Sequence, residues 1–203
     1  MNSPEVLWHY TTFESLRKIL LSKSLLASDF QLLNDSTEVH YGIKKIDLWL
    51  GENEKIARGL VPKIDFLNAV ERSHWPFVIS FSEERDDLSM WRGYSNATID
   101  QDGVAIGFDR NDLGLLAVSN DFRGPTKVAY SDGEIETLLE SSRTVLEAEL
   151  AVPLFKKLRL VAPLIKHKAF FREKEWRMVR GAEEGVGTRI DPSKRPVFES
   201  VGT

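Results

Sequence analysis

The sequence contains no cysteine. This absence excludes disulfide bonds, iron–sulfur clusters, thiolate zinc sites and a cysteine nucleophile. Long hydrophobic runs are also missing, because no stretch approaches the roughly 18–20 apolar residues that a membrane span needs. The first residues lack the basic start and apolar core of a secretory signal. We therefore expect a cytoplasmic protein that is not embedded in a membrane.

The motifs of several common enzyme classes are absent as well. The four histidines form no i, i+4 pair around a glutamate, so a zinc hydrolase is disfavoured and we expect no metal. No glycine-rich loop ends in lysine followed by serine or threonine, which disfavours a kinase or another P-loop enzyme. No GxSxG motif occurs, which disfavours a serine hydrolase.

The composition is that of an ordinary globular protein. The chain has 203 residues, of which 42% are hydrophobic and 29% charged, and this predicts a single domain over residues 1–203. A net charge of −4 gives the whole molecule no general affinity for nucleic acid. Residues 156–180 are locally basic, however. This local charge fits either a polyanionic ligand or a solvated helix face.

Hydrophobic periodicity predicts a mixture of strands and helices. Strands are expected over residues 6–10, 25–28, 75–81, 103–108, 126–130 and 174–180. Helices are expected from Thr11 with Glu14 completing a capping box, from Asp35 or Ser36 to Leu50, and over residues 52–73, 88–94, 132–150 and 155–165. Strands at both ends and in the middle, with helices clustered between them, predict an α+β fold.

Three short motifs lie near the ends of expected strands. They are HYT (His9, Tyr10, Thr11), SFS (Ser80, Phe81, Ser82) and EKE (Glu173, Lys174, Glu175). Two carboxylates spaced i, i+2 in a strand point to one face, and so do two serines with the same spacing. Each motif alone has a structural explanation, because Thr11 fits a helix cap, His9 a buried histidine and EKE a solvated strand.

The order of these motifs carries a resemblance. The segment LWHYTTFESLRKILLSKSLLAS resembles the opening of ADP-ribosyltransferase-like proteins, and HYT, SFS, EKE is similar to the three-part signature of that superfamily. With NDSTE at residues 34–38, SFSEERDDLSMWRGY at 80–94, GVAIGF at 103–108 and EKEWR at 173–177, the chain resembles the bacterial domain of unknown function 2971 family. The resemblance covers about residues 7–181 and leaves the tail, 182–203, outside it.

The resemblance implies a fold and an activity. The fold would be an ADP-ribosyltransferase-like split mixed β-sheet with an inserted helical region. The activity would be an NAD-dependent ADP-ribosyltransferase, with NAD as co-substrate, which transfers ADP-ribose to a macromolecular acceptor, protein or nucleic acid, and releases nicotinamide. Bacterial relatives of this fold suggest a toxin or antiphage effector.

Carried over to this sequence, the resemblance assigns the catalytic carboxylates. Glu175 would stabilise the oxocarbenium-like state in which nicotinamide leaves ribose, because a nearby negative charge stabilises developing positive charge. Glu173 would help to activate the acceptor. Ser80 and Ser82 would orient the catalytic carboxylate.

The remaining assignments concern NAD binding. His9 would bind the adenosine-side ribose, while Tyr10 and Thr11 would face nicotinamide. The resemblance gives no clear match for the aromatic residues that stack on nicotinamide, and Trp91 and Tyr94 are the candidates. At i, i+3 these two fit a packed helix face equally well. The central element is SFS rather than Ser-Thr-Ser, so Phe81 stands where a hydroxyl is expected.

Other classes of function stay open. The chain fits an NAD glycohydrolase, a non-catalytic NAD- or ADP-ribose-binding module, or an interaction domain whose aromatic and charged residues are structural. Asn34, Asp35 and Glu38 fit a helix cap, with contact to ligand or acceptor as the alternative. The sequence predicts neither the acceptor nor the oligomeric state.

Overall fold

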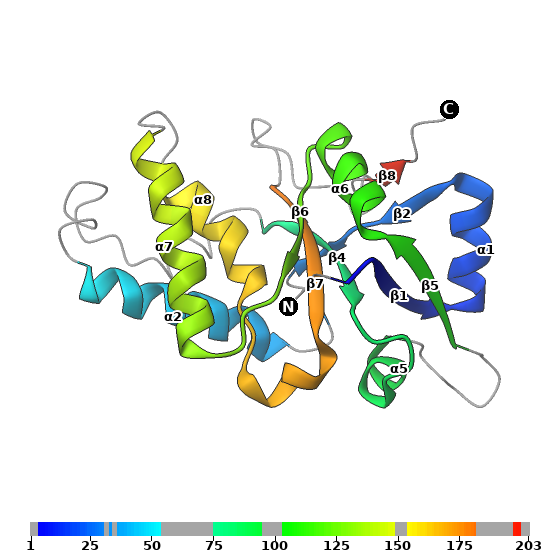
Figure 1. Cartoon of the computed structure of the whole chain (residues 1–203), viewed down its shortest axis with the longest axis horizontal. Coiled ribbons are helices and arrows are strands. Elements are labelled where there is room, and N and C mark those ends of the chain that lie inside the picture. Colours follow the sequence, from blue (N-terminus) through cyan, green and yellow to red (C-terminus); the bar gives the residue numbers. More distant parts are fainter. Residues whose placement is uncertain are drawn as a thin grey trace.

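A computed structural model describes residues 4–30, 33, 36–53, 75–94, 103–148, 154–181 and 197–199 (Figure 1). The strands are β1 (Val6–Thr12), β2 (Ser24–Leu26), β3 (Ser28–Asp29), β4 (Phe77–Ser82), β5 (Gly103–Asp109), β6 (Arg123–Lys127), β7 (Glu175–Arg180) and β8 (Val197–Glu199). The helices are α1 (Phe13–Ser22), α2 (Ser36–Glu52), α5 (Leu88–Tyr94), α6 (Arg110–Ser119), α7 (Asp132–Ala148), α8 (Leu154–Val161) and the 3₁₀ turns η2 (Ala162–Leu164) and η3 (Lys168–Glu173). The predicted α+β class is confirmed.

The main sheet is open and antiparallel. Its strands run in the order β5-β1-β4-β7-β6, with β3 also paired to β4, while β2 and β8 form a separate ladder. The described ladders of both sheets are antiparallel, so the expectation of a mixed sheet was wrong. Strand periodicity reveals which residues share a face, but it does not encode the direction of the neighbouring strand.

The sheet is loosely joined between β1 and β4. Strand β1 pairs with β5 along its whole length, from Val6 opposite Asp109 to Thr12 opposite Gly103. With β4, in contrast, its one register pair is Trp8 opposite Ser82. On its other side β4 pairs with β7 from end to end. The two halves of the sheet therefore diverge from a junction at Ser82.

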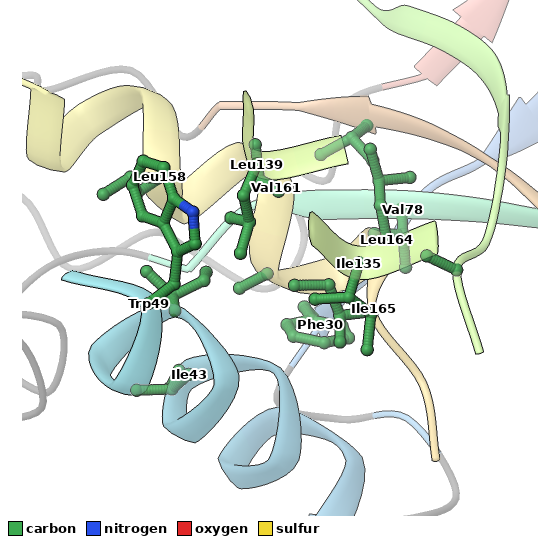
Figure 2. Close-up of a cluster of buried hydrophobic side chains, with 14 of the residues drawn as sticks. Phe30, Ile43, Trp49, Val78, Ile135, Leu139, Leu158, Val161, Leu164 and Ile165 are labelled. Carbon is green, nitrogen blue, oxygen red and sulfur yellow. The ribbon is translucent and has the colours of Figure 1, made fainter. Parts of the chain in front are cut away.

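Both faces of β4 are buried, which explains its apolar run. Phe77, Ile79 and Phe81 point into a core that α6 closes with Leu113 and Ala117. Val78 points the opposite way, into a second core closed by helices α2, α7 and α8. Figure 1 shows these three helices grouped on one side, and Figure 2 shows the labelled side chains of that core, among them Phe30, Ile43, Trp49, Val78, Ile135, Leu139, Leu158, Val161, Leu164 and Ile165.

Several predicted elements are present with shifted ends. The first helix is capped by Thr12, whose hydroxyl accepts from the Ser15 amide, rather than by Thr11 with Glu14. Thr11 remains in β1, opposite Val104. Helix α6 was not predicted, although Asp109 caps it by accepting from the amides of Asn111 and Asp112. The helix predicted over 52–73 lies mostly outside the described residues.

Close packing of α2 against η2 predicts a large effect at one glycine. A methyl group at Gly42 would lie 2.5 Å from the Ala162 carbonyl oxygen, which is backbone and yields little. We expect Gly42→Ala to lower the free energy of unfolding by about 1–3 kcal/mol in urea titration. Gly114→Ala in α6 is the matched control, because nothing lies within 4 Å of its Cβ and alanine favours helix by up to about 1 kcal/mol. Equal effects of both changes would contradict the packing argument.

Candidate functional site

The three motifs lie on three neighbouring strands. HYT is in β1, SFS ends β4, and EKE leads into β7, so that β4 stands between the other two. Ser82 is opposite Trp8 on one side and opposite Glu175 on the other. The motifs are far apart in sequence and meet at one end of the sheet, next to the junction between its halves.

A buried ion network surrounds Glu175. Arg177 Nε donates to Glu175 Oε1 at 2.7 Å and Nη2 to Oε2 at 2.8 Å, which makes a bidentate pair. Lys166 Nζ lies 2.6 Å from Glu173 Oε2, 3.1 Å from Glu175 Oε2 and 3.4 Å from Glu38 Oε2. Arg177 also binds Glu38 Oε1 and donates to the Pro163 carbonyl at 2.6 Å. Charge-assisted hydrogen bonds of this kind are the strongest that side chains form.

Four separate segments of the fold supply this network. Glu175 and Arg177 are i, i+2 in β7 and share the face that Val179 buries against the helical core. Glu38 lies in the first turn of α2. Lys166 follows η2, where its amide donates to the Ala129 carbonyl at 3.0 Å, and Glu173 ends η3. The network thus ties the sheet to the helices that cover this face.

The protonation states within the network follow from burial and charge. Burial alone would raise the pKa of Glu175, but the charges of Arg177 and Lys166 outweigh it and lower this pKa to about 2. Burial likewise opposes the charged forms of Lys166 and Arg177, yet the Glu175 carboxylate raises the pKa of both. Glu175 is therefore a carboxylate throughout the neutral range.

Glu173 has a different environment. Burial raises its pKa above the ordinary value, and the nearby Lys166 ammonium only partly offsets this effect. Its side chain is 12% exposed, whereas the Glu175 and Arg177 side chains are 0% exposed. Glu173 is accordingly the member of the network that meets solvent and the one best suited to exchange a proton.

Three hydroxyl groups lie around the carboxylates. Tyr130 accepts a hydrogen bond from the Glu175 amide at 3.0 Å, so its own proton is available to another acceptor. Burial, followed by the charge of Glu175, raises the pKa of Tyr130 and of Tyr94, and both phenols stay neutral. Ser80 Oγ is buried without a hydrogen bond of ordinary geometry, although it lies close enough to help lower the pKa of Glu175.

His9 fills the junction between β1 and β4. Its Nδ1 lies 2.9 Å from the Ser80 carbonyl oxygen, which can only accept, so Nδ1 carries the proton and Nε2 is left as an acceptor. The ring also contacts Phe81, at 5.7 Å between centroids. Burial lowers the pKa of His9, and the bond to Ser80 only partly opposes this effect. His9 is therefore a neutral imidazole beside the SFS motif.

The predicted set His9, Tyr10 and Thr11 does not lie on one face of β1. Alternation along β1 places Tyr10 on the opposite face from the other two. The Tyr10 hydroxyl donates to the Glu84 carbonyl at 2.7 Å and accepts from the Asp87 amide at 3.1 Å, and its ring packs edge-on against Trp91. The Tyr10 hydroxyl therefore donates one hydrogen bond to the loop that follows β4 and accepts another from it.

Trp91 and Tyr94, both in α5, have different surroundings. Trp91 Nε1 donates to Asp86 at 2.7 Å near the surface. Tyr94 is close enough to the buried network for Glu175, Lys166 and Arg177 to affect its pKa. Of the two predicted nicotinamide-stacking residues, Tyr94 is the one next to Glu175.

Ser82 contacts the backbone of Glu173, which lies just before β7 and not within it. Glu173 ends η3, and Lys174 follows in the left-handed conformation with φ 42°, so the EKE motif is not one continuous strand. Ser82 Oγ donates to the Glu173 carbonyl at 2.7 Å and accepts from the Glu84 amide at 3.0 Å. Ser82 therefore fixes the backbone at Glu173, and both glutamates still reach Lys166.

The sequence analysis did not identify three residues of the site, Arg177, Lys166 and Tyr130, and it left the role of a fourth, Glu38, open. Arg177 was open to inference, because an arginine two residues after Glu175 in a strand shares its face. Lys166 and Tyr130 had no comparable signal, since both lie in short irregular segments. Glu38 was considered as a cap or ligand contact and is instead bound to Lys166 and Arg177. Asn34 and Asp35 lie outside the described residues.

Comparison with known proteins supports the family resemblance. Residues 90–178 match the model of a family described as "Protein of unknown function (DUF2971)". The matched part begins within α5 and ends in β7, and it includes Lys166, Glu173, Glu175 and Arg177. HYT, SFS and Glu38 lie outside it. The description of this family states no activity. Neither the curated proteins nor the solved structures contain a significant match.

The described residues contain neither a membrane-spanning helix nor a cluster of metal ligands. None of the described helices combines the length and apolar character that crossing a bilayer requires. Within the same residues, no group of three or more histidine, aspartate or glutamate side chains is arranged to hold a metal ion.

Proposed function

We propose that this protein is an NAD-dependent ADP-ribosyltransferase that releases nicotinamide and transfers ADP-ribose to a macromolecular acceptor. The observation that carries the proposal is the meeting of HYT, SFS and EKE on β1, β4 and β7, with an ionised Glu175 beside Ser80. A permanent carboxylate is what an oxocarbenium-like state requires for stabilisation.

The form of the sheet supports the same proposal. An ADP-ribosyltransferase-like fold has a split sheet, and here β1 and β4 share the single register pair of Trp8 and Ser82. His9 lies at that split, where its Nε2 would accept a hydrogen bond from a ribose hydroxyl. In the proposed complex NAD enters at this junction.

The two glutamates take different roles in the proposed reaction. Glu175 stays anionic and stabilises the positive charge that develops on the nicotinamide-side ribose as the glycosidic bond breaks. Glu173 is partly exposed and has a raised pKa. It takes the proton of the acceptor while the acceptor attacks the ribose carbon from which nicotinamide leaves. Nicotinamide leaves with the electron pair of the broken bond.

The burial of Glu175 favours a second candidate, a non-catalytic module that binds NAD or ADP-ribose. Both carboxylate oxygens already accept hydrogen bonds from Arg177, and Oε2 also accepts from Lys166. Direct contact with a ribose therefore requires this side chain to become accessible when the ligand binds. A chain that never makes this change would bind a nucleotide without turning it over.

The decisive experiment combines binding with turnover. Purified protein is incubated with NAD labelled in the adenylate and with a cell lysate, while calorimetry follows NAD binding to the protein alone. We expect saturable binding, release of free nicotinamide and label in a macromolecular fraction. The Glu173→Gln chain, purified in parallel, reveals any contaminating NAD-consuming activity.

Each other outcome selects a different function. Nicotinamide release without labelled macromolecule would indicate an NAD glycohydrolase. Saturable binding without nicotinamide release would establish the non-catalytic module. The absence of both binding and turnover would overturn the nucleotide hypotheses together.

A further inference from the structure

The buried network carries an unmatched charge. It contains three carboxylates, Glu38, Glu173 and Glu175, but two cations, Lys166 and Arg177. With every group ionised, one negative charge has no partner. Side-chain exposure in the network does not exceed 12%, and an unmatched charge in so dry an environment is unfavourable. Uptake of one proton would restore neutrality.

The number of partners shows which carboxylate takes that proton. Glu175 accepts from Arg177 at 2.7 and 2.8 Å and from Lys166 at 3.1 Å. Glu38 contacts Arg177 and, at 3.4 Å, Lys166. Among the described residues, Glu173 has one cationic partner, Lys166 at 2.6 Å. The least stabilised anion is therefore Glu173, which is also the carboxyl in contact with water.

We propose that Glu173 is the proton-exchanging carboxyl of the site and that Lys166 is the positioning residue that sets its proton affinity. The use of this proton in turnover rests on the proposed function, whereas the proton equilibrium itself does not. In the proposed reaction, Lys166 keeps Glu173 deprotonated often enough to accept a proton from the acceptor. Solvent then receives that proton at the exposed edge of the site.

The groups around Glu173 leave Lys166 as its dominant partner. Glu38 acts on it from α2 and Glu175 from β7, and Arg177 binds both of these carboxylates. Tyr94 lies near it in α5 and Tyr130 in the segment after β6. The other two carboxylates disfavour a further negative charge, and the two phenols are neutral.

Two contacts hold Lys166 toward this network. Its amide donates to the Ala129 carbonyl, and its ammonium lies 5.0 Å from the centre of the Phe170 ring. Lys174, the immediate neighbour of Glu173, is directed away and pairs with Glu84.

The test is a carboxyl titration of the full chain. Protein labelled with ¹³C-glutamate is titrated by NMR, and the signal that disappears in Glu173→Gln identifies Glu173. Lys166→Met is expected to raise the midpoint of Glu173 by about 1–3 pH units, because it removes an opposite charge at hydrogen-bond distance. Glu38→Gln removes a like charge and is expected to lower the midpoint. Lys166→Arg retains the charge and should titrate close to the native chain.

The Glu173 midpoint is expected to rise in Lys166→Met and to fall in Glu38→Gln. These opposite shifts distinguish an electrostatic effect on Glu173 from general damage to the fold. If Lys166→Met does not fold, Lys166→Gln removes the same charge with a polar side chain, and an upward shift of the Glu173 midpoint in that variant decides the question. A native midpoint in Glu38→Gln, or an unchanged one in folded Lys166→Met, would overturn the proposal.

Turnover separates this proposal from the proposed function. Where nicotinamide is released, the acid limb of its pH profile should move with the NMR midpoint in each variant. Normal titration shifts without any NAD turnover would overturn the proposed function and retain the proton site.

Discussion

Arg177→Met is expected to destabilise the protein by about 3–5 kcal/mol, which is the usual cost of removing one partner from a buried ion pair. Arg177 is fully buried and donates to Glu175, Glu38 and the Pro163 carbonyl. Without it, two buried carboxylates lose their principal cation and one backbone oxygen loses its donor. Urea titration of the native and variant chains measures the difference in the free energy of unfolding.

Two control variants separate the effect of the buried ion network from the effect of removing any arginine. Arg177→Lys keeps the charge but cannot reproduce the bidentate bond, so we expect it to fall between Arg177→Met and the native chain. Arg17→Met removes an arginine whose side chain is 64% exposed beside Glu14, and a change below about 1 kcal/mol is expected. A loss at Arg177 no larger than the loss at Arg17 would show that the network contributes little to the fold.

Strand β4 shows what the sequence could predict about the fold. Its run of apolar residues is long because both faces are covered, Phe77, Ile79 and Phe81 on one side and Val78 on the other. Helix α6 was not predicted, because its apolar pattern is weak. Leu113 and Ala117 make a narrow apolar stripe, while the exposed Leu115 and Val118 interrupt its amphipathic pattern.

The candidate site was predictable where the chemistry is local. The spacing of Glu173 and Glu175 predicted that both lie on one face of a strand, whereas a left-handed Lys174 joins them; both nevertheless contact Lys166. The adjacency of β1, β4 and β7 agrees with the order of motifs that suggested a common site. Two other members of the network, Lys166 and Glu38, lie outside β7. No local pattern connects them to β7, because such contacts arise from the tertiary packing of α2 and η2 against the sheet.

The glutamate pair gives the second large expected effect. If the proposed function holds, Glu173→Gln should lower the rate of nicotinamide release with transfer by about 10²–10⁴-fold, the usual contribution of a general base. This variant removes the unmatched negative charge, and its amide oxygen still accepts from Lys166. We therefore expect its stability to equal or exceed that of the native chain, so that lost turnover reports chemistry rather than unfolding.

Glu175→Gln should behave differently in both measurements. It removes the charge that would stabilise the transition state, for which a loss of about 10²–10³-fold is expected. It also breaks the bidentate pair with Arg177, because an amide offers one oxygen where the carboxylate offers two, so its free energy of unfolding should fall, unlike that of Glu173→Gln. Glu136→Gln, at an exposed position in α7, is the carboxylate control and should change neither quantity. If Glu175→Gln loses stability but retains full turnover when folded, Glu175 is a structural ion and the catalytic carboxylate lies elsewhere.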